Sequence, residues 1–471
     1  SYRVWGWPGS VREAAVGSEW AVLNGAAVFV VANDGPYTVV VERPPEWPRA
    51  ITPLPGDGDT FHAADLDTLF DSPWLVGDPQ VVAGQVGGAP FDTVVLGEPA
   101  TFDPARAAAD AARVAEAVAR EWGGVPWPRY DLLVWVGDRG GGGLEHANGA
   151  LLTAPRWADD AEHRRFAALA AHEIAHGWNG KRLRPAGLGP FDYRREVYTP
   201  SLWVVEGVTS YLGDLAVARS GAGDEAELLA ALSRAVTGVQ SAPGRRVESL
   251  AAASTDAWIG EYKPDADTPN RDTSYYRKGE VVAFLLDAEI RRATADRQTI
   301  HDWLRLALEQ FGDRGYEEPE LRALASEVAG RDLGPFFARA VDSTDELDYG
   351  GALNWFGLRW AEPGPPVASL GCEVDGRLGV VAVRDDTPAA RAGLAVGDEL
   401  VALGGFRLSS DGLTAAIEQL GVGYTGPLTV ARGGRMHELT VTLDARPRGW
   451  TLEPDPAASP IAHRRRERWS R

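Results

Sequence analysis

Cysteine is nearly absent from this chain, since Cys372 is the only one in 471 residues. A single thiol excludes an internal disulfide and a thiolate-based zinc site, so metal ligands must come from the eight histidines and the carboxylates. Lysine is also scarce, and only Lys181, Lys263 and Lys278 accompany the arginines. No hydrophobic run approaches the roughly 20 residues that a membrane span needs.

Acidic residues outnumber basic ones in this chain, with 67 Asp and Glu against 47 Lys and Arg. The net charge of −20 and the pI near 4.9 argue against a nucleic-acid binder, because neutralising phosphates requires a basic surface. The length suits two to four domains, and the hydrophobic content of 44% is ordinary for a globular protein. No signal-peptide pattern opens the chain, so we expect a cytoplasmic location, with a periplasmic or secreted one as the alternative.

The order of local patterns predicts a β-rich start followed by a mainly helical middle. Short β-branched runs at 26–32 and 37–41 predict strands. Further on, the patterns predict a strand at 130–136 and helices at 103–122, 201–219, 274–292, 302–311 and 318–329. Shorter strands and helices then alternate to about residue 443. The basic end of the chain favours a solvated, disordered tail over an electrostatic docking segment.

The pattern His172-Glu173-Ile174-Ala175-His176 carries the strongest chemical signal. On a helix, two histidines four residues apart point the same way and can hold one metal ion, with Glu173 beside it as a base. Chance produces the same pattern in many proteins that bind no metal. Here the surrounding helix is apolar on most sides, and a buried helix needs partners for two histidines and a glutamate. The sequence therefore predicts a zinc site and metal-assisted hydrolysis.

A third zinc ligand is predicted at Glu206, which stands among apolar neighbours on the next strong helix. The alternative is a glutamate that caps a helix or forms a salt bridge. An oxyanion donor is also needed, and a tyrosine at 275 or 276 can supply one, although core packing is the more common use of such a residue.

A glycine cluster ends in Gly142-Gly143-Leu144-Glu145-His146. Gly142 and Gly143 would let the backbone approach a ligand closely, and Glu145 could bind a cationic amine. A flexible surface loop is an equally good interpretation of this segment by itself.

Five segments together resemble the glycyl aminopeptidase family of gluzincin (HEXXH plus Glu) zinc metallopeptidases, in order and in approximate spacing. They are GGLEH at 142–146, HEIAHGWNGKRLRP at 172–185, LWVVEGVTSY at 202–211, DAWIGEYKPD at 256–265 and SYYRKG at 274–279. The resemblance implies a multidomain α+β protein with an N-terminal β domain at 1–100, shorter than in relatives. It also implies a thermolysin-like catalytic domain at 101–350, a PDZ domain at 351–445 and the basic tail at 446–471.

The same resemblance implies roles for individual residues. One Zn²⁺ per chain would be bound by His172, His176 and Glu206, with Glu173 as the general base. Tyr276 would stabilise the oxyanion, and Glu145 would hold the free α-amine of a peptide. The implied activity is removal of N-terminal residues, with a preference for glycine and alanine.

The C-terminal module resembles a bacterial-type PDZ domain, on the segments Leu370-Gly371-Cys372, TPAARAGL at 387–394 and GDEL at 397–400. Such domains add a peptide to a sheet edge and can capture its C-terminal carboxylate, here at the loop 370–372. A purely packing role is the alternative. Our preferred hypothesis is a zinc aminopeptidase; the alternatives are an endopeptidase on the same site and a catalytically weak protein that binds peptides through its PDZ domain.

Overall fold

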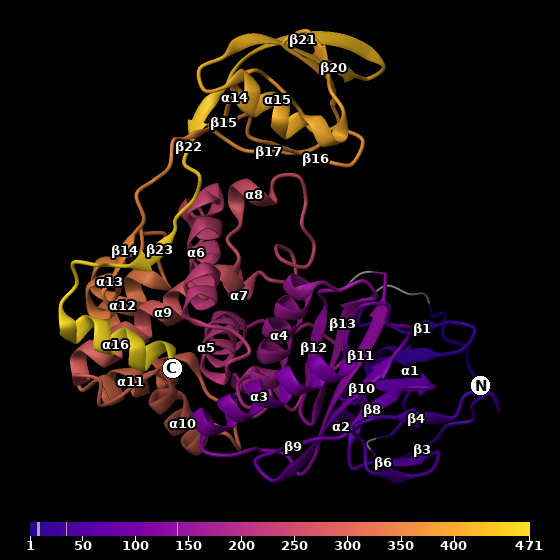
Figure 1. Ribbon diagram of the computed structural model, residues 1–471. Helices are drawn as coiled ribbons and strands as arrows, with labels where there is room; N and C mark the ends of the chain where they lie inside the picture. The colour runs from indigo at the N-terminus through magenta and orange to yellow at the C-terminus, as the bar shows by residue number, and fades with distance from the viewer. Residues whose placement is uncertain (7–9, 34, 139) are drawn as a thin grey trace.

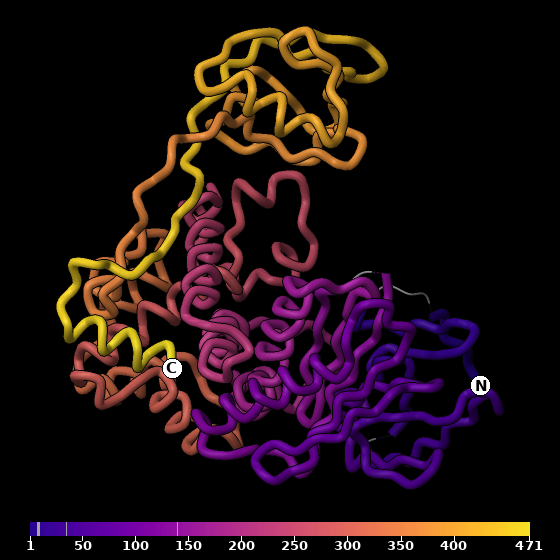
Figure 2. The backbone as a smooth tube through the Cα atoms, viewed as in Figure 1, coloured from indigo at the N-terminus to yellow at the C-terminus, as the bar shows by residue number. Residues whose placement is uncertain are grey.

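The structure, a computed structural model, describes residues 1–6, 10–33, 35–138 and 140–471. Figure 1 shows a β-rich N-terminal part, a central part with many helices, and a smaller C-terminal part that stands above the helices. The backbone tube in Figure 2 shows that two extended segments connect this upper part to the rest. The multidomain α+β fold predicted from the sequence is confirmed.

Two small antiparallel sheets form the N-terminal part, with strand orders β1-β2-β7-β4 and β3-β6-β5. The strand predicted at 37–41 is confirmed as β3, but the one predicted at 26–32 is wrong, because α1 occupies its first half. Asn24 explains the helix, since its side chain accepts a hydrogen bond from the Ala26 amide and so caps the first turn. The elements are β1 Ala15–Val16, β2 Ala21–Leu23, α1 Gly25–Val28, β3 Tyr37–Val40, β4 Arg49–Ile51, β5 Gly56–Asp57, β6 Thr60–Ala63, α2 Leu66–Phe70 and β7 Trp74–Gly77.

A larger sheet separates the N-terminal part from the helices. Its order is β12-β13-β11-β10-β8, with β9 paired to β10; β10, β11 and β13 are parallel, and β12 is an antiparallel edge strand. Along β11, Leu132 and Val134 join the core under the helices, while Leu133 packs toward the N-terminal sheet. The elements are β8 Gln80–Val82, β9 Gln85–Val86, β10 Ala89–Leu96, α3 Pro104–Trp122, β11 Tyr130–Gly137, β12 Gly143–His146, β13 Gly149–Pro155 and α4 Asp160–Ala175.

Helices make up the rest of the central part. The predicted helices at 103–122, 274–292, 302–311 and 318–329 are confirmed as α3, α9, α10 and α11. None of the helices in the described ranges is long and apolar enough to cross a membrane. The elements are η1 Ala186–Leu188, η2 Trp203–Val208, α5 Thr209–Ser220, α6 Glu225–Ser241, η3 Pro243–Arg246, α7 Leu250–Thr255, α8 Thr268–Arg271, α9 Tyr275–Thr294, α10 Ile300–Phe311, α11 Glu318–Ala329, α12 Gly334–Ala340 and α13 Gly350–Phe356.

The upper part in Figure 1 is inserted between two paired strands, β14 and β23. It has its own hydrophobic core, separate from that of the helices below. Both connecting segments therefore start from the same two-stranded sheet. The elements are β14 Leu358–Trp360, β15 Val367–Ser369, β16 Cys372–Val374, β17 Val380–Val383, α14 Pro388–Arg391, β18 Glu399–Leu403, β19 Phe406–Arg407, η4 Ser410–Gly412, α15 Leu413–Leu420, β20 Thr425–Arg432, β21 Arg435–Thr442, β22 Asp444–Arg446 and β23 Leu452–Pro454.

The disordered tail predicted from the basic composition is wrong. Helix α16 (Pro460–Ser470) follows β23 and returns the chain to the central part. Trp469 is fully buried, stacks on Phe356 at 4.5 Å between ring centroids, and donates from Nε1 to the Tyr211 hydroxyl at 2.7 Å. Burial of Trp469 thus keeps the end of the chain ordered in spite of its many basic residues, because long basic side chains can still reach solvent or acidic partners.

Replacing this anchor should destabilise the central part. We expect Trp469→Ala to lower the free energy of unfolding by about 3–5 kcal/mol, since it empties a buried aromatic site and removes a buried hydrogen bond to the Tyr211 hydroxyl. Trp157 is 71% exposed, so Trp157→Ala is the matched control. Denaturant titration measures both; equal effects of the two substitutions would show that α16 does not anchor the chain end.

Candidate metal centre

Helix α4 carries the predicted metal motif. Asp159 caps its start by accepting a hydrogen bond from the Glu162 amide at 2.8 Å. His172 lies in the last turn, and His176 follows directly after the helix. Their Nε2 atoms face one another at 3.0 Å, so the two imidazoles converge on one point.

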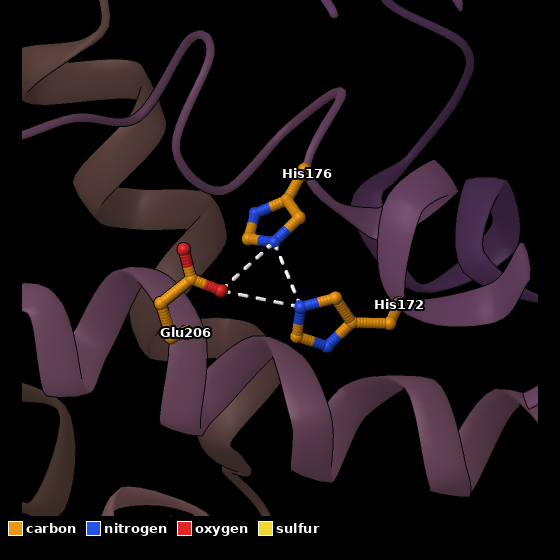
Figure 3. Close-up of side chains that lie close together, drawn as sticks. All are labelled: His172, His176 and Glu206. Carbon is orange, nitrogen blue, oxygen red and sulfur yellow. Dashed lines mark hydrogen bonds and ion pairs between the residues drawn. The ribbon is translucent and has the colours of Figure 1, made fainter. Parts of the chain in front are cut away.

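Glu206 in η2 reaches the same point, as Figure 3 shows. Its Oε2 atom lies 3.2 Å from the Nε2 of His172 and 3.3 Å from that of His176. Three atoms that bind one zinc ion tetrahedrally, each about 2.0–2.1 Å from the metal, lie about 3.3 Å apart. The three side chains therefore have the spacing of a zinc ligand set.

The donor atoms of this cluster also fit a cation. The Nδ1 atom of His176 lies 2.9 Å from the Asn179 carbonyl, which places a proton there and leaves the Nε2 lone pair directed at the cluster. Burial opposes ionisation of Glu206, but the neighbouring His176 and His172 rings outweigh it and lower the pKa of Glu206, so this side chain is a carboxylate. A carboxylate and two imidazole lone pairs this close together repel unless positive charge lies between them.

Close backbone contact between helices brings the two histidines and Glu206 together. Glu206 lies in η2, a stretch of π-helix that precedes α5; the sequence predicted an ordinary helix over 201–219. A Cβ atom on Gly207 would lie 2.4 Å from the Cα of Gly279 in α9, so a larger residue at 207 would push the helices apart. Asn179 is fully buried and donates from Nδ2 to the Val204 carbonyl at 2.8 Å, which ties the end of α4 to η2.

Two further carboxylates lie beside the ligand cluster. Oxygen atoms of Glu145 and Glu173 and a ring nitrogen of His176 all lie within 4.8 Å of one another. A Cβ atom on Gly143 would lie 2.1 Å from Oε1 of Glu173, so a larger residue there would displace this carboxylate from its present position. Burial, with the charges of Glu145 and Glu206, raises the pKa of Glu173. Gly142 is hydrogen-bonded to Thr153 on β13.

Tyr276 faces the cluster from α9. Its ring centroid is 6.3 Å from that of His172, and it stacks on Tyr275 at 4.8 Å. Tyr275 is almost fully buried, so the structure distinguishes the two tyrosines where the pattern alone did not. Burial and the Glu206 charge raise the pKa of Tyr276 far above its usual value, which keeps the hydroxyl proton available for donation.

The N-terminal part contributes Asp71 to the surroundings of Glu145. Asp71, directly after α2, accepts from the Lys181 ammonium at 2.6 Å, the Ala147 amide at 2.7 Å and the His146 ring at 3.2 Å. These contacts fix the turn that follows Glu145. Asp71, Glu145 and Lys181 also line a cleft of about 430 Å³ between the two parts.

Sequence reasoning assigned no role to Asn179, Asp71 or Lys181. Lys181 carried a weak signal, as one of three lysines in an arginine-rich chain. Asn179 carried another, because a polar amide follows the metal motif in an otherwise buried turn. Asp71 had no local signal, since its partners are about 75 or more positions away.

Comparisons of sequence agree with this geometry. Residues 165–282 match the M61 glycyl aminopeptidase family, residues 1–78 match the peptidase M61 N-terminal domain, and residues 367–443 match the PDZ domain. A comparison with curated protein sequences gives no match.

Solved structures with the same fold are also peptidases by name. An aminopeptidase N family protein from Idiomarina loihiensis is 25% identical, with a TM-score of 0.92 over 99% of this chain and 85% of that chain. An M1 zinc metallopeptidase from Deinococcus radiodurans is 16% identical, with a TM-score of 0.50 over 72% of this chain and 73% of that chain, and shows likeness of fold. The chain thus contains a peptidase M61 N-terminal domain, an M61 glycyl aminopeptidase domain and a C-terminal PDZ domain, and it is a metallopeptidase.

Proposed function

We propose that this peptidase is a zinc-dependent aminopeptidase that removes N-terminal residues, with a preference for glycine and alanine. The observation that carries the proposal is the position of Glu145. Its carboxylate lies within 4.8 Å of both the Glu173 carboxylate and a His176 ring nitrogen. A free α-ammonium bound there would place the first peptide carbonyl of a substrate near the ligand cluster. The small-residue preference rests on the family resemblance.

In this mechanism each residue of the site has a separate role. His172, His176 and Glu206 would hold one Zn²⁺, which supplies Lewis acidity toward the carbonyl and the attacking water when bound. Glu173 takes the proton from that water and passes it to the leaving nitrogen. Tyr276 donates a hydrogen bond to the developing oxyanion.

Replacing the base tests the chemistry. We expect Glu173→Gln to reduce release from alanyl and glycyl chromogenic amides by about 10²- to 10⁴-fold, because an amide cannot accept the proton. Its zinc content should remain near one ion per chain, since Glu173 is not a proposed ligand. Similar rates for the parent and the variant would contradict this role.

Removing the metal tests the ligand set. A chelator should abolish hydrolysis, and added Zn²⁺ should restore it in the parent. Glu206→Gln should bind zinc about 10-fold or more weakly, because a carboxylate ligand is lost. Elemental analysis after dialysis measures this without reference to activity, and full zinc retention in the variant would exclude Glu206 as a ligand.

Replacing Glu145 distinguishes an aminopeptidase from an endopeptidase on the same site. The parent should cleave peptides with a free N-terminus much faster than acetylated ones. We expect Glu145→Ala to reduce this ratio about tenfold or more, since the charged partner of the amine is removed. A parent that cuts acetylated peptides equally fast would favour the endopeptidase.

We also propose that the PDZ domain binds the C-terminal carboxylate of a peptide at Leu370-Gly371-Cys372. This loop, β16 and α15 line a cavity of about 520 Å³. Gly371 has φ +87°, a conformation that turns the loop as only glycine does readily. Fluorescence polarisation should show tighter binding of free than of amidated peptide C-termini, and equal affinities would favour a packing role.

A further inference from the structure

One amide side chain connects the PDZ domain to the catalytic part. Asn270 in α8 donates from Nδ2 to the Val383 carbonyl at 3.0 Å and accepts from the Asp385 amide at 2.9 Å. Its amide group therefore offers one donor and one acceptor to the backbone at the end of β17, as a neighbouring β-strand would. Asn270 is only 8% exposed, so both bonds are shielded from solvent.

Within the described residues, few other polar contacts join the two parts. Arg384 donates to the Ser241 carbonyl at 3.3 Å, and the Trp450 amide in the second connecting segment donates to Thr237 at 2.8 Å. The PDZ core is separate from the catalytic core. The position of the PDZ domain therefore depends on a small number of hydrogen bonds, with Asn270 the most buried of these partners on the catalytic side.

Asn270 is also bonded to the loop at 256–267 that precedes it. Its Nδ2 atom donates to Asp267 at 3.1 Å. Within the same turn, one oxygen of Asp265 accepts from the amides of Asp267 at 2.9 Å and Thr268 at 3.0 Å. The C-terminal end of the loop is thus fixed at the point where the PDZ domain docks (Figure 1).

The same loop carries Tyr262 to the tyrosines of α9. The Tyr262 hydroxyl lies 3.3 Å from that of Tyr275 and 3.5 Å from that of Tyr276. The Arg12 guanidinium covers its ring at 5.0 Å, and Trp258 of the same loop donates to the Val197 carbonyl at 3.0 Å. Tyr262 is 42% exposed, so these contacts, and not burial, determine where its hydroxyl lies.

We propose that Tyr262 is a positioning residue for the Tyr276 hydroxyl, and that the PDZ domain keeps Tyr262 in place through Asn270. The catalytic consequence rests on the proposed function of Tyr276 as oxyanion donor. The effect of the PDZ domain on the loop at 256–267 does not rest on that function, because it concerns only how firmly the loop is held. In this arrangement the PDZ domain completes the active site from outside the catalytic domain.

Tyr262→Phe removes the hydroxyl and keeps the ring under Arg12. We expect kcat on an alanyl amide to fall about threefold to tenfold, the range for one lost hydrogen bond, with KM nearly unchanged. Tyr198 is an exposed tyrosine on a neighbouring loop, and Tyr198→Phe is the matched control. An unchanged kcat, or a change in KM alone, would overturn the role of Tyr262.

Asn270→Ala tests the connection to the PDZ domain. We expect it to lower kcat about threefold in the parent and to have little further effect in the Tyr262→Phe background, since both act through the same hydroxyl. Additive effects in this double-mutant cycle would overturn the connection. Met436→Ala, on the exposed face of β21, is the control for substitution within the PDZ domain.

Hydrogen exchange on the full chain separates this inference from the proposed function. Asn270→Ala should speed amide exchange of residues 256–267 severalfold, and Met436→Ala should not. Unchanged exchange would overturn the docking role of Asn270. A parent with no aminopeptidase activity would overturn the proposed function and with it the role of Tyr262, while the exchange result would still decide the docking.

Discussion

The candidate site requires the fold to hold imidazole nitrogens and carboxylate oxygens, which repel one another, within a few ångströms. Two imidazole nitrogens and a carboxylate oxygen lie 3.0–3.3 Å apart, and two more carboxylates lie nearby. Without a cation this arrangement is unfavourable, because burial removes the water that would screen it. The surrounding fold must therefore hold the groups in place by itself, and the tight helix crossing at Gly207 and Gly279 does much of this.

Buried polar side chains connect this crossing to the ligands. The Asn179 side chain is hydrogen-bonded to η2, and its carbonyl is hydrogen-bonded to the His176 ring, so one residue orients this ring and connects two helical segments. Removing the Asn179 side chain would leave several buried polar groups without partners, which lowers the free energy of unfolding by more than the loss of one surface hydrogen bond would. Such a network explains how a chain of loops and short helices can keep three ligand atoms in register.

Each neighbouring domain makes a few polar contacts close to the site. Asp71 from the N-terminal part fixes the turn beside Glu145. Asn270, beside the loop of Tyr262, is hydrogen-bonded to the PDZ domain. Neither contact belongs to the ligand cluster, yet each bears on a residue that faces a substrate in the proposed mechanism. The catalytic domain is thus supported on two sides by domains that are distant in sequence.

The sequence by itself determined the residue types of the cluster and the helix that carries two of them, because a four-residue spacing on a capped, apolar helix leaves His172 and His176 on one face. It also determined most long helices, since their periodicity and caps are local. It could not determine the helix at α1 or the docking of α16, where one cap and one buried tryptophan outweigh composition. The position of the Tyr276 ring beside His172, the partners of Asp71 and the contact through Asn270 were decided only by the tertiary structure, because each joins residues from separate elements and chain separation carries no local signal.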